Sequence, residues 1–127
     1  MSTFAVSLVL GGCKSPMPLP QGKTGVMATY EHPTLHCVLP AAARVPAVIA
    51  AAEATVRARG YSVSESNSTE ESGVVVARPP RTVTVPMTRI SVKRVFQGTK
   101  VEITYEPWGD SASSRVMLDG ILQRLDL

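Results

Sequence analysis

One cysteine near the start of the chain has neighbours that suit covalent attachment of a lipid. Leu10, Gly11 and Gly12 precede Cys13, and an apolar run spans residues 4–10. A lipoprotein signal peptidase requires small residues before the cysteine, whose thiol then carries the acyl chain. The pattern is typical of a bacterial lipobox. It predicts cleavage between Gly12 and Cys13 and lipidation of Cys13.

The segment before Cys13 departs from a full secretory signal. Its apolar core has seven residues, and no Lys or Arg precedes it. A translation start farther upstream would explain this, whereas residues 5–10 could instead form an N-terminal strand. We expect an exported protein attached to a membrane by lipid alone, since no segment approaches the roughly 20 apolar residues of a membrane helix. Lys14 is compatible with delivery to the outer membrane, facing the periplasm.

A second set of residues has side chains used in metal binding or catalysis: Glu31, His32, His36, Cys37 and Asp110. On an unbroken strand the two histidines share a face about 13 Å apart, too far to bind one metal unless Pro33 bends the chain. Cys37 points to the opposite face from His36, so a thiolate–imidazole pair is not expected. We expect Cys37 to be a small buried side chain instead. We therefore expect no catalytic residue and no cofactor, with His32 and His36 as weak metal candidates.

The composition indicates a small single domain. Removal of the first 12 of 127 residues leaves 115, enough for one hydrophobic core. The net charge of +3, from 13 basic and 10 acidic residues, is too small to indicate a nucleic-acid partner. The expected partners are the membrane, through Cys13, and possible envelope proteins, while the oligomeric state stays open.

A hairpin in the second half of the chain places charge on one face. If Gln97-Gly98 is a two-residue turn, Lys93 lies opposite Glu102 and Arg89 opposite Glu106, with apolar residues on the other face. A solvated sheet face is therefore favoured over a basic patch for an acidic polymer. Arg94 falls on the apolar face, where it would extend to solvent or mark a bulge.

The periodicity predicts the following elements: a strand over 26–38 interrupted or bent at Pro33, a helix over 41–59, strands over 61–65, 73–77 and 82–96, a strand after the hairpin turn, and a helix over 111–127. The fold class is α+β, a two-layer sandwich of a mainly antiparallel four- to five-stranded sheet with two helices on one face, in the order β-α-β-β-β-β-α. Residues 1–12 form the signal peptide, 13–25 the lipidated cysteine and a flexible tether, and 26–127 one domain.

Two residues of the last helix have expected roles. Asp110 is placed to cap its N-terminus. Gly120, inside the helix, costs up to about 1 kcal/mol relative to Ala, so we expect it to allow close approach to the sheet.

The order of motifs resembles a known family. The motifs are Arg59-Gly60-Tyr61, the run from Thr99 to Tyr105, Gly109-Asp110, Ser114-Arg115 and Leu118-Asp119-Gly120-Ile121. After a lipobox and a Pro/Gly-rich segment, this order resembles the small bacterial lipoproteins of domain-of-unknown-function family 3568. The resemblance implies two helices packed on one antiparallel sheet, exposed on a Gram-negative-type envelope, and brings no catalytic residues.

The functional expectation is a non-catalytic binding or interaction module. Trp108, beside a helix start, is the candidate binding residue, although it could instead pack on the second helix. The alternatives are a structural envelope component without a defined ligand, and a histidine-dependent metal-binding protein or enzyme.

Overall fold

The fold is α+β, with one antiparallel sheet covered on one face by two helices. The computed structural model describes residues 16–80 and 87–127, so the signal segment, Cys13 and Lys14 lie outside the described residues. The strands are β2 (Leu19–Gln21), β3 (Val26–Glu31), β4 (Thr34–Leu39), β5 (Ser62–Ser68), β6 (Ser72–Arg78), β7 (Met87–Val95) and β8 (Gly98–Glu106). They form one seven-stranded sheet in the order β2-β3-β4-β8-β7-β6-β5. The predicted class is confirmed, but the predicted count of four to five strands is too low.

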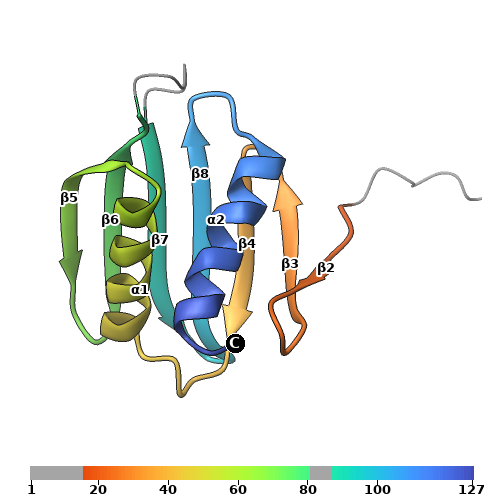
Figure 1. Ribbon diagram of the computed structural model, residues 1–127. Coiled ribbons are helices and arrows are strands. Elements are labelled where there is room, and N and C mark those ends of the chain that lie inside the picture. Colours follow the sequence, from red (N-terminus) through yellow and green to blue (C-terminus); the bar gives the residue numbers. More distant parts are fainter. Residues whose placement is uncertain (1–15, 81–86) are drawn as a thin grey trace, which may run out of the picture.

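Helices α1 (Val45–Ala58) and α2 (Ser111–Arg124) lie side by side on the same face of this sheet (Figure 1). Their apolar sides and the inner face of the sheet share one hydrophobic core. The largest fully buried core side chains come from both layers: Leu35, Leu39, Ile90 and Ile103 from the sheet, and Met117, Leu118, Ile121 and Leu122 from α2. Neither helix is long and apolar enough to span a membrane.

Residues 26–38 form a hairpin rather than one bent strand. The chain reverses at His32 and Pro33, and β3 then pairs with β4 so that Tyr30 lies opposite Leu35. The predicted break at Pro33 is therefore a complete reversal, which adds one strand to the sheet.

The sheet also begins earlier than the expected domain start at Val26. Residues of β2 pair with β3, and the turn between them contains Gly22 and Gly25, both at positive φ. Gln21 is buried and ties β2 to α2: its side-chain amide donates to Asp119 Oδ1 at 2.7 Å and accepts from Arg115 Nη1 at 2.9 Å. The Pro/Gly-rich composition suggested a tether here, but these long-range hydrogen bonds fix the segment as an edge strand.

The β7–β8 hairpin keeps the predicted faces but not the predicted register. The turn is Phe96-Gln97, so Lys93 lies opposite Lys100 and Arg89 opposite Thr104. This is a shift of two residues, and side chains alternate with a period of two, so no side chain changes face. Arg94 reaches solvent at the strand end.

The helix boundaries and contacts refine the prediction. Helix α1 begins at Val45 rather than at residue 41, with a proline in its first turn. Asp110 caps α2 as predicted, because its carboxylate accepts a hydrogen bond from Ser113 N. The prediction for Gly120 is wrong in its partner: an added Cβ there would lie 2.6 Å from Thr55 Cγ2, so the close approach is to α1 and not to the sheet.

Candidate binding surface

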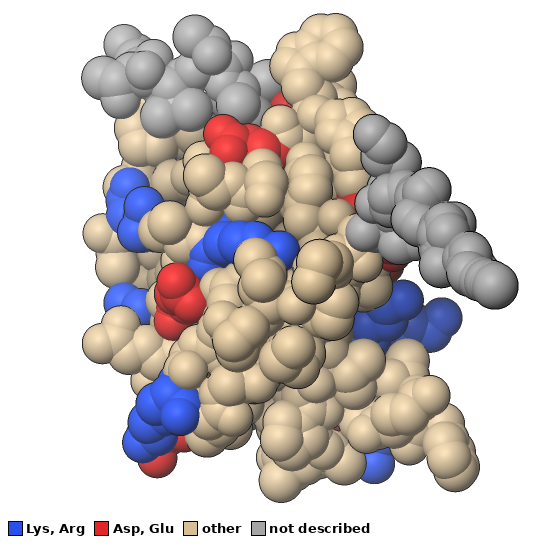
Figure 2. Space-filling model, turned by 90° about the vertical axis from the view of Figure 1, so that its right-hand side faces the viewer, with Lys and Arg blue, Asp and Glu red and all other residues tan. Residues whose placement is uncertain are grey.

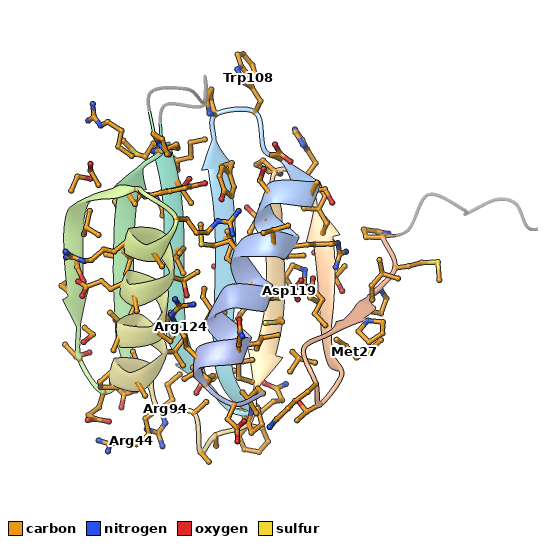
Figure 3. The ribbon with its side chains drawn as sticks, in the orientation of Figure 1. Met27, Arg44, Arg94, Trp108, Asp119 and Arg124 are labelled. Carbon is orange, nitrogen blue, oxygen red and sulfur yellow. The ribbon has the colours of Figure 1, made fainter. Side chains whose placement is uncertain are left out.

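Trp108 lies on the loop between β8 and α2, at one end of the sheet. The residue is 76% exposed, and its side chain projects away from the body of the molecule (Figure 3). The alternative expectation, a tryptophan packed on α2, does not describe this side chain. A large aromatic ring is thus presented to solvent.

The loop that carries Trp108 is held at several points. Gly109 N donates to Tyr105 O at 2.7 Å, and the Asp110 carboxylate accepts from Ser113 N at 3.0 Å. Gly109 has φ +80°, and a Cβ at this position would lie 2.5 Å from Tyr30 Oη. Because the loop packs this closely against the end of the β3–β4 hairpin, its backbone has little room to move.

Strand β3 and the β3–β4 turn contribute two further aromatic side chains at the same end, Tyr30 and His32. Tyr30 Oη lies 3.5 Å from His32 Nδ1, and the two rings meet edge-on with centroids 6.3 Å apart. Partial burial, and secondarily the negative charge of Asp110, raise the pKa of Tyr30 above its ordinary value of 10.0. We call Tyr30, His32, Trp108 and Asp110 the apical surface. It offers a ring for stacking together with hydroxyl and imidazole groups for hydrogen bonds.

Sequence reasoning found Trp108 and Asp110 but gave Tyr30 no role. Tyr30 and Trp108 are far apart in the chain, and they lie at the same end of the sheet because the β3–β4 hairpin packs against Gly109, the residue after Trp108. The one sequence feature that could have indicated a role for Tyr30 is its spacing of two residues from His32, which places both rings near one turn.

The two predicted metal candidates, His32 and His36, have different partners. His32 lies in the turn, whereas His36 is on β4, on the sheet face that the helices leave open, and contacts Glu31 Oε1 through Nε2 at 2.6 Å. Within residues 16–80 and 87–127, no group of three or more His, Cys, Asp or Glu side chains is arranged to hold a metal ion.

Cys37 lies in the hydrophobic core, as expected for a small buried side chain. It is 3% exposed and faces Ala28 and Val101 on the adjacent strands. Burial raises the pKa of its thiol to about 12. The neutral thiol is therefore the form that the fold favours.

We predict that the protein loses stability in alkaline solution through Cys37. Its folded pKa of about 12 lies above the ordinary value of 9.0, so the stabilisation is complete below pH 9 and is lost as the pH rises toward 12. Between pH 9 and 11 the free energy of unfolding should fall by on the order of 2 kcal/mol from this group. Urea unfolding at each pH measures it. An equally steep pH dependence in Cys37→Ala would contradict the assignment.

The open face of the sheet carries charges of both signs. Arg89 Nε lies 3.1 Å from Glu106 Oε2, and Lys100 Nζ lies 3.7 Å from Glu102 Oε2. Lys93 is exposed and faces Lys100. Although the register differs from the prediction, Arg89 still reaches Glu106 diagonally. The face is a mixed-charge, solvated surface, in agreement with the favoured interpretation of these cations.

A well-defined hollow lies at the other end of the molecule from Trp108. It measures about 380 Å³ and is lined by Gly22, Lys23, Asp119, Gln123, Asp126 and Leu127. It lies between the β2–β3 turn and the C-terminal part of α2. Trp108 lines neither this hollow nor the smaller one beside Pro40, Ala43 and Leu125, and its side chain protrudes from the surface (Figure 3).

Searches against models of known protein families and against curated proteins find no match for this chain.

Proposed function

We propose that this chain is a lipid-anchored envelope protein whose α+β domain is a non-catalytic binding or interaction module. Acylated Cys13 is the anchor, and the apical surface around Trp108 is the site that meets a partner. The sequence Leu10-Gly11-Gly12-Cys13 supports the anchor. The exposure of Trp108 and the hydrogen bonds of the adjacent Gly109 and Asp110 support the binding role.

The exposure of Trp108 is the observation that carries the binding role. A tryptophan side chain can bury roughly 200 Å² of surface, so leaving most of the ring in water forgoes roughly 3–4 kcal/mol of hydrophobic stabilisation. The domain itself covers little of this surface, because Trp108 is 76% exposed. A partner that covers the ring would gain that free energy on binding.

The rigidity of the loop adds to this argument. The hydrogen bond from Gly109 N to Tyr105 O and the Asp110 cap restrict the loop before any partner arrives. Binding to a surface that is already ordered costs less conformational entropy than binding to a mobile loop. The apical surface therefore resembles a binding hot spot in composition, since it combines an aromatic ring with polar groups.

The anchor is tested by replacing its sulfur. In Cys13→Ser the protein should move from the membrane fraction to the soluble fraction and should lose incorporation of labelled fatty acid, because a hydroxyl at this position is not lipidated. Cys37→Ser is the matched control for a cysteine that is not acylated. Unchanged membrane fractionation and acyl label in Cys13→Ser would refute the anchor.

The binding role is tested by truncating the exposed ring. A photo-crosslinking residue placed at His32 should capture a defined envelope partner in living cells. The additional change Trp108→Ala should lower the yield at least about tenfold, because hot-spot truncations commonly cost more than 1.4 kcal/mol of binding free energy. Phe96→Ala is the control, since Phe96 is a fully exposed aromatic residue on the β7–β8 turn at the other end of the sheet. Equal yields from the Trp108→Ala and Phe96→Ala proteins would contradict the assignment.

A further inference from the structure

The early start of the sheet shortens the chain between Cys13 and the folded body. Pro16, the first residue that the structure describes, is three residues after Cys13, and β2 starts at Leu19. Extended chain covers at most about 3.6 Å per residue, so Leu19 lies within about 22 Å of the Cys13 Cα. With residues 14–25 as a tether the domain could turn freely above a bilayer, but with this spacing the β2 side must stay close to it.

The same side of the molecule exposes apolar residues. Met17 is 73% exposed, Leu19 48% and Met27 52%. Leu19 pairs with Ala28 and Pro20 with Met27, so Leu19 and Met27 extend from opposite faces of the sheet at its edge. Met27 lies on the β2 and β3 side in Figure 3, away from Trp108. We call Met17, Leu19 and Met27 the β2 edge.

The β2 edge is unsuited to pairing with another strand. Pro16, Pro18 and Pro20 alternate along it, and proline has no backbone N–H to donate. Strand β2 is also only three residues long. Prolines in an edge strand, and a short edge strand, both hinder the addition of another strand, whether it comes from a partner or from a second copy of the chain. The exposed side chains, and not the backbone, are therefore what this edge offers.

The charge along this edge fits a lipid surface. From residue 16 to residue 28 the single charged side chain is Lys23, which forms an ion pair with Asp126. Figure 2, in which this side of the molecule faces the viewer, shows charged groups around a broad uncharged area. Residues 16–28 contain no carboxylate, and the two that adjoin them are engaged, Asp119 by Gln21 and Asp126 by Lys23. The apolar side chains can enter the interface of a bilayer that contains anionic lipid.

We infer that the β2 edge lies against the bilayer surface, with Met17, Leu19 and Met27 in contact with lipid. The inference rests on the proposed acylation of Cys13. It sets the sheet edge-on to the membrane, with β5 farthest from the lipid, and it leaves the apical surface free at the side.

Tryptophan quenching by brominated lipids tests this orientation. In a Trp108→Phe background, a tryptophan is placed at the edge by Met17→Trp or Met27→Trp, and the acylated full chain is reconstituted into vesicles of phosphatidylcholine and phosphatidylglycerol. The control is Ser66→Trp on β5, an exposed residue at the opposite edge of the sheet. Six strand spacings separate the two edges, which is about 29 Å. Bromine quenches only on near contact, so the fluorescence of the Met17→Trp and Met27→Trp proteins should fall at least twofold and that of the Ser66→Trp protein by less than a tenth. Circular dichroism checks that each variant folds.

The outcomes separate this inference from the proposed function. Acylation is read by mass spectrometry of the reconstituted protein. A protein that carries the acyl group but shows no quenching in Met17→Trp and Met27→Trp overturns the orientation and leaves the anchor intact. Quenching in Phe96→Trp instead would place the β7–β8 turn on the membrane, and this also overturns the inference. Absence of the acyl group overturns the anchor and the orientation together.

Discussion

The substitution Gly98→Ala should lower the free energy of unfolding by at least about 3 kcal/mol. Gly98 opens β8 with φ +154°, and a Cβ at this position would lie 2.1 Å from Leu39 O. The clash is with a backbone carbonyl of the neighbouring strand, so no side-chain rotation relieves it. Strand β8 would have to separate from β4 near the centre of the sheet. Urea unfolding followed by circular dichroism measures the loss.

Gly25→Ala is the matched control for this prediction. Gly25 also has a positive φ, of +72°, but the nearest heavy atom to an added Cβ is 4.0 Å away. This variant therefore reports conformational strain without a clash, and about 1 kcal/mol is expected. Equal losses in Gly98→Ala and Gly25→Ala would mean that the contact with Leu39 O does not determine the effect.

The substitution Gly120→Val should cost about 3 kcal/mol and disturb the packing of the two helices. An added Cβ would lie 2.6 Å from Thr55 Cγ2, and Thr55 is buried with its hydroxyl bonded to Ala51 O at 2.7 Å. Because that side chain is held, α1 and α2 would have to move apart, which loosens the core beneath them. Chemical unfolding measures the free energy.

A double-mutant cycle isolates the contact between the helices. Gly120→Ala gains up to about 1 kcal/mol of helix propensity but meets Thr55 Cγ2, so a net loss of about 1 kcal/mol is expected. In Thr55→Ala the methyl group is absent, and there the same Gly120→Ala change should be neutral or stabilising. If Gly120→Ala destabilises the Thr55→Ala protein as much as the parent protein, the helix contact is not the cause.

The β7–β8 hairpin shows what an alternating pattern of apolar and polar residues can predict and what it cannot. Residues alternate between apolar and polar along both strands, which predicted the faces correctly. The register was wrong by two residues, because that shift conserves every face and the pattern cannot distinguish the alternatives. The tight fit of Gly98 against Leu39 O, which belongs to another hairpin, places Gly98 inside the strand.

Two other errors have the same origin in contacts across the fold. Residues 19–21 have the composition of a tether, and they become a strand because Gln21 bonds to Arg115 and Asp119 on α2. Gly120 was correctly expected to permit close approach, but its partner is Thr55 on α1. Neither partner can be identified from the local sequence.

The candidate surface was predictable only in part. The exposure of Trp108, and the contact of the adjacent Gly109 with Tyr30, follow from the way the β8–α2 loop meets the β3–β4 hairpin at one end of the sheet. The burial of Cys37 and the helix cap at Asp110 were accessible from the sequence, because each depends on local pattern.

The sequence by itself determined the α+β class, both helices, the faces of the central hairpin, and a lipobox-like motif at Cys13 as an expectation. These depend on residue type and short-range periodicity. The tertiary structure alone decided the seven-stranded order, the hairpin register, the partner of Gly120 and the edge strand that brings Met17, Leu19 and Met27 together. The physical reason is that strand pairing and helix contacts are settled by atoms far apart in the chain, whose fit no local pattern specifies.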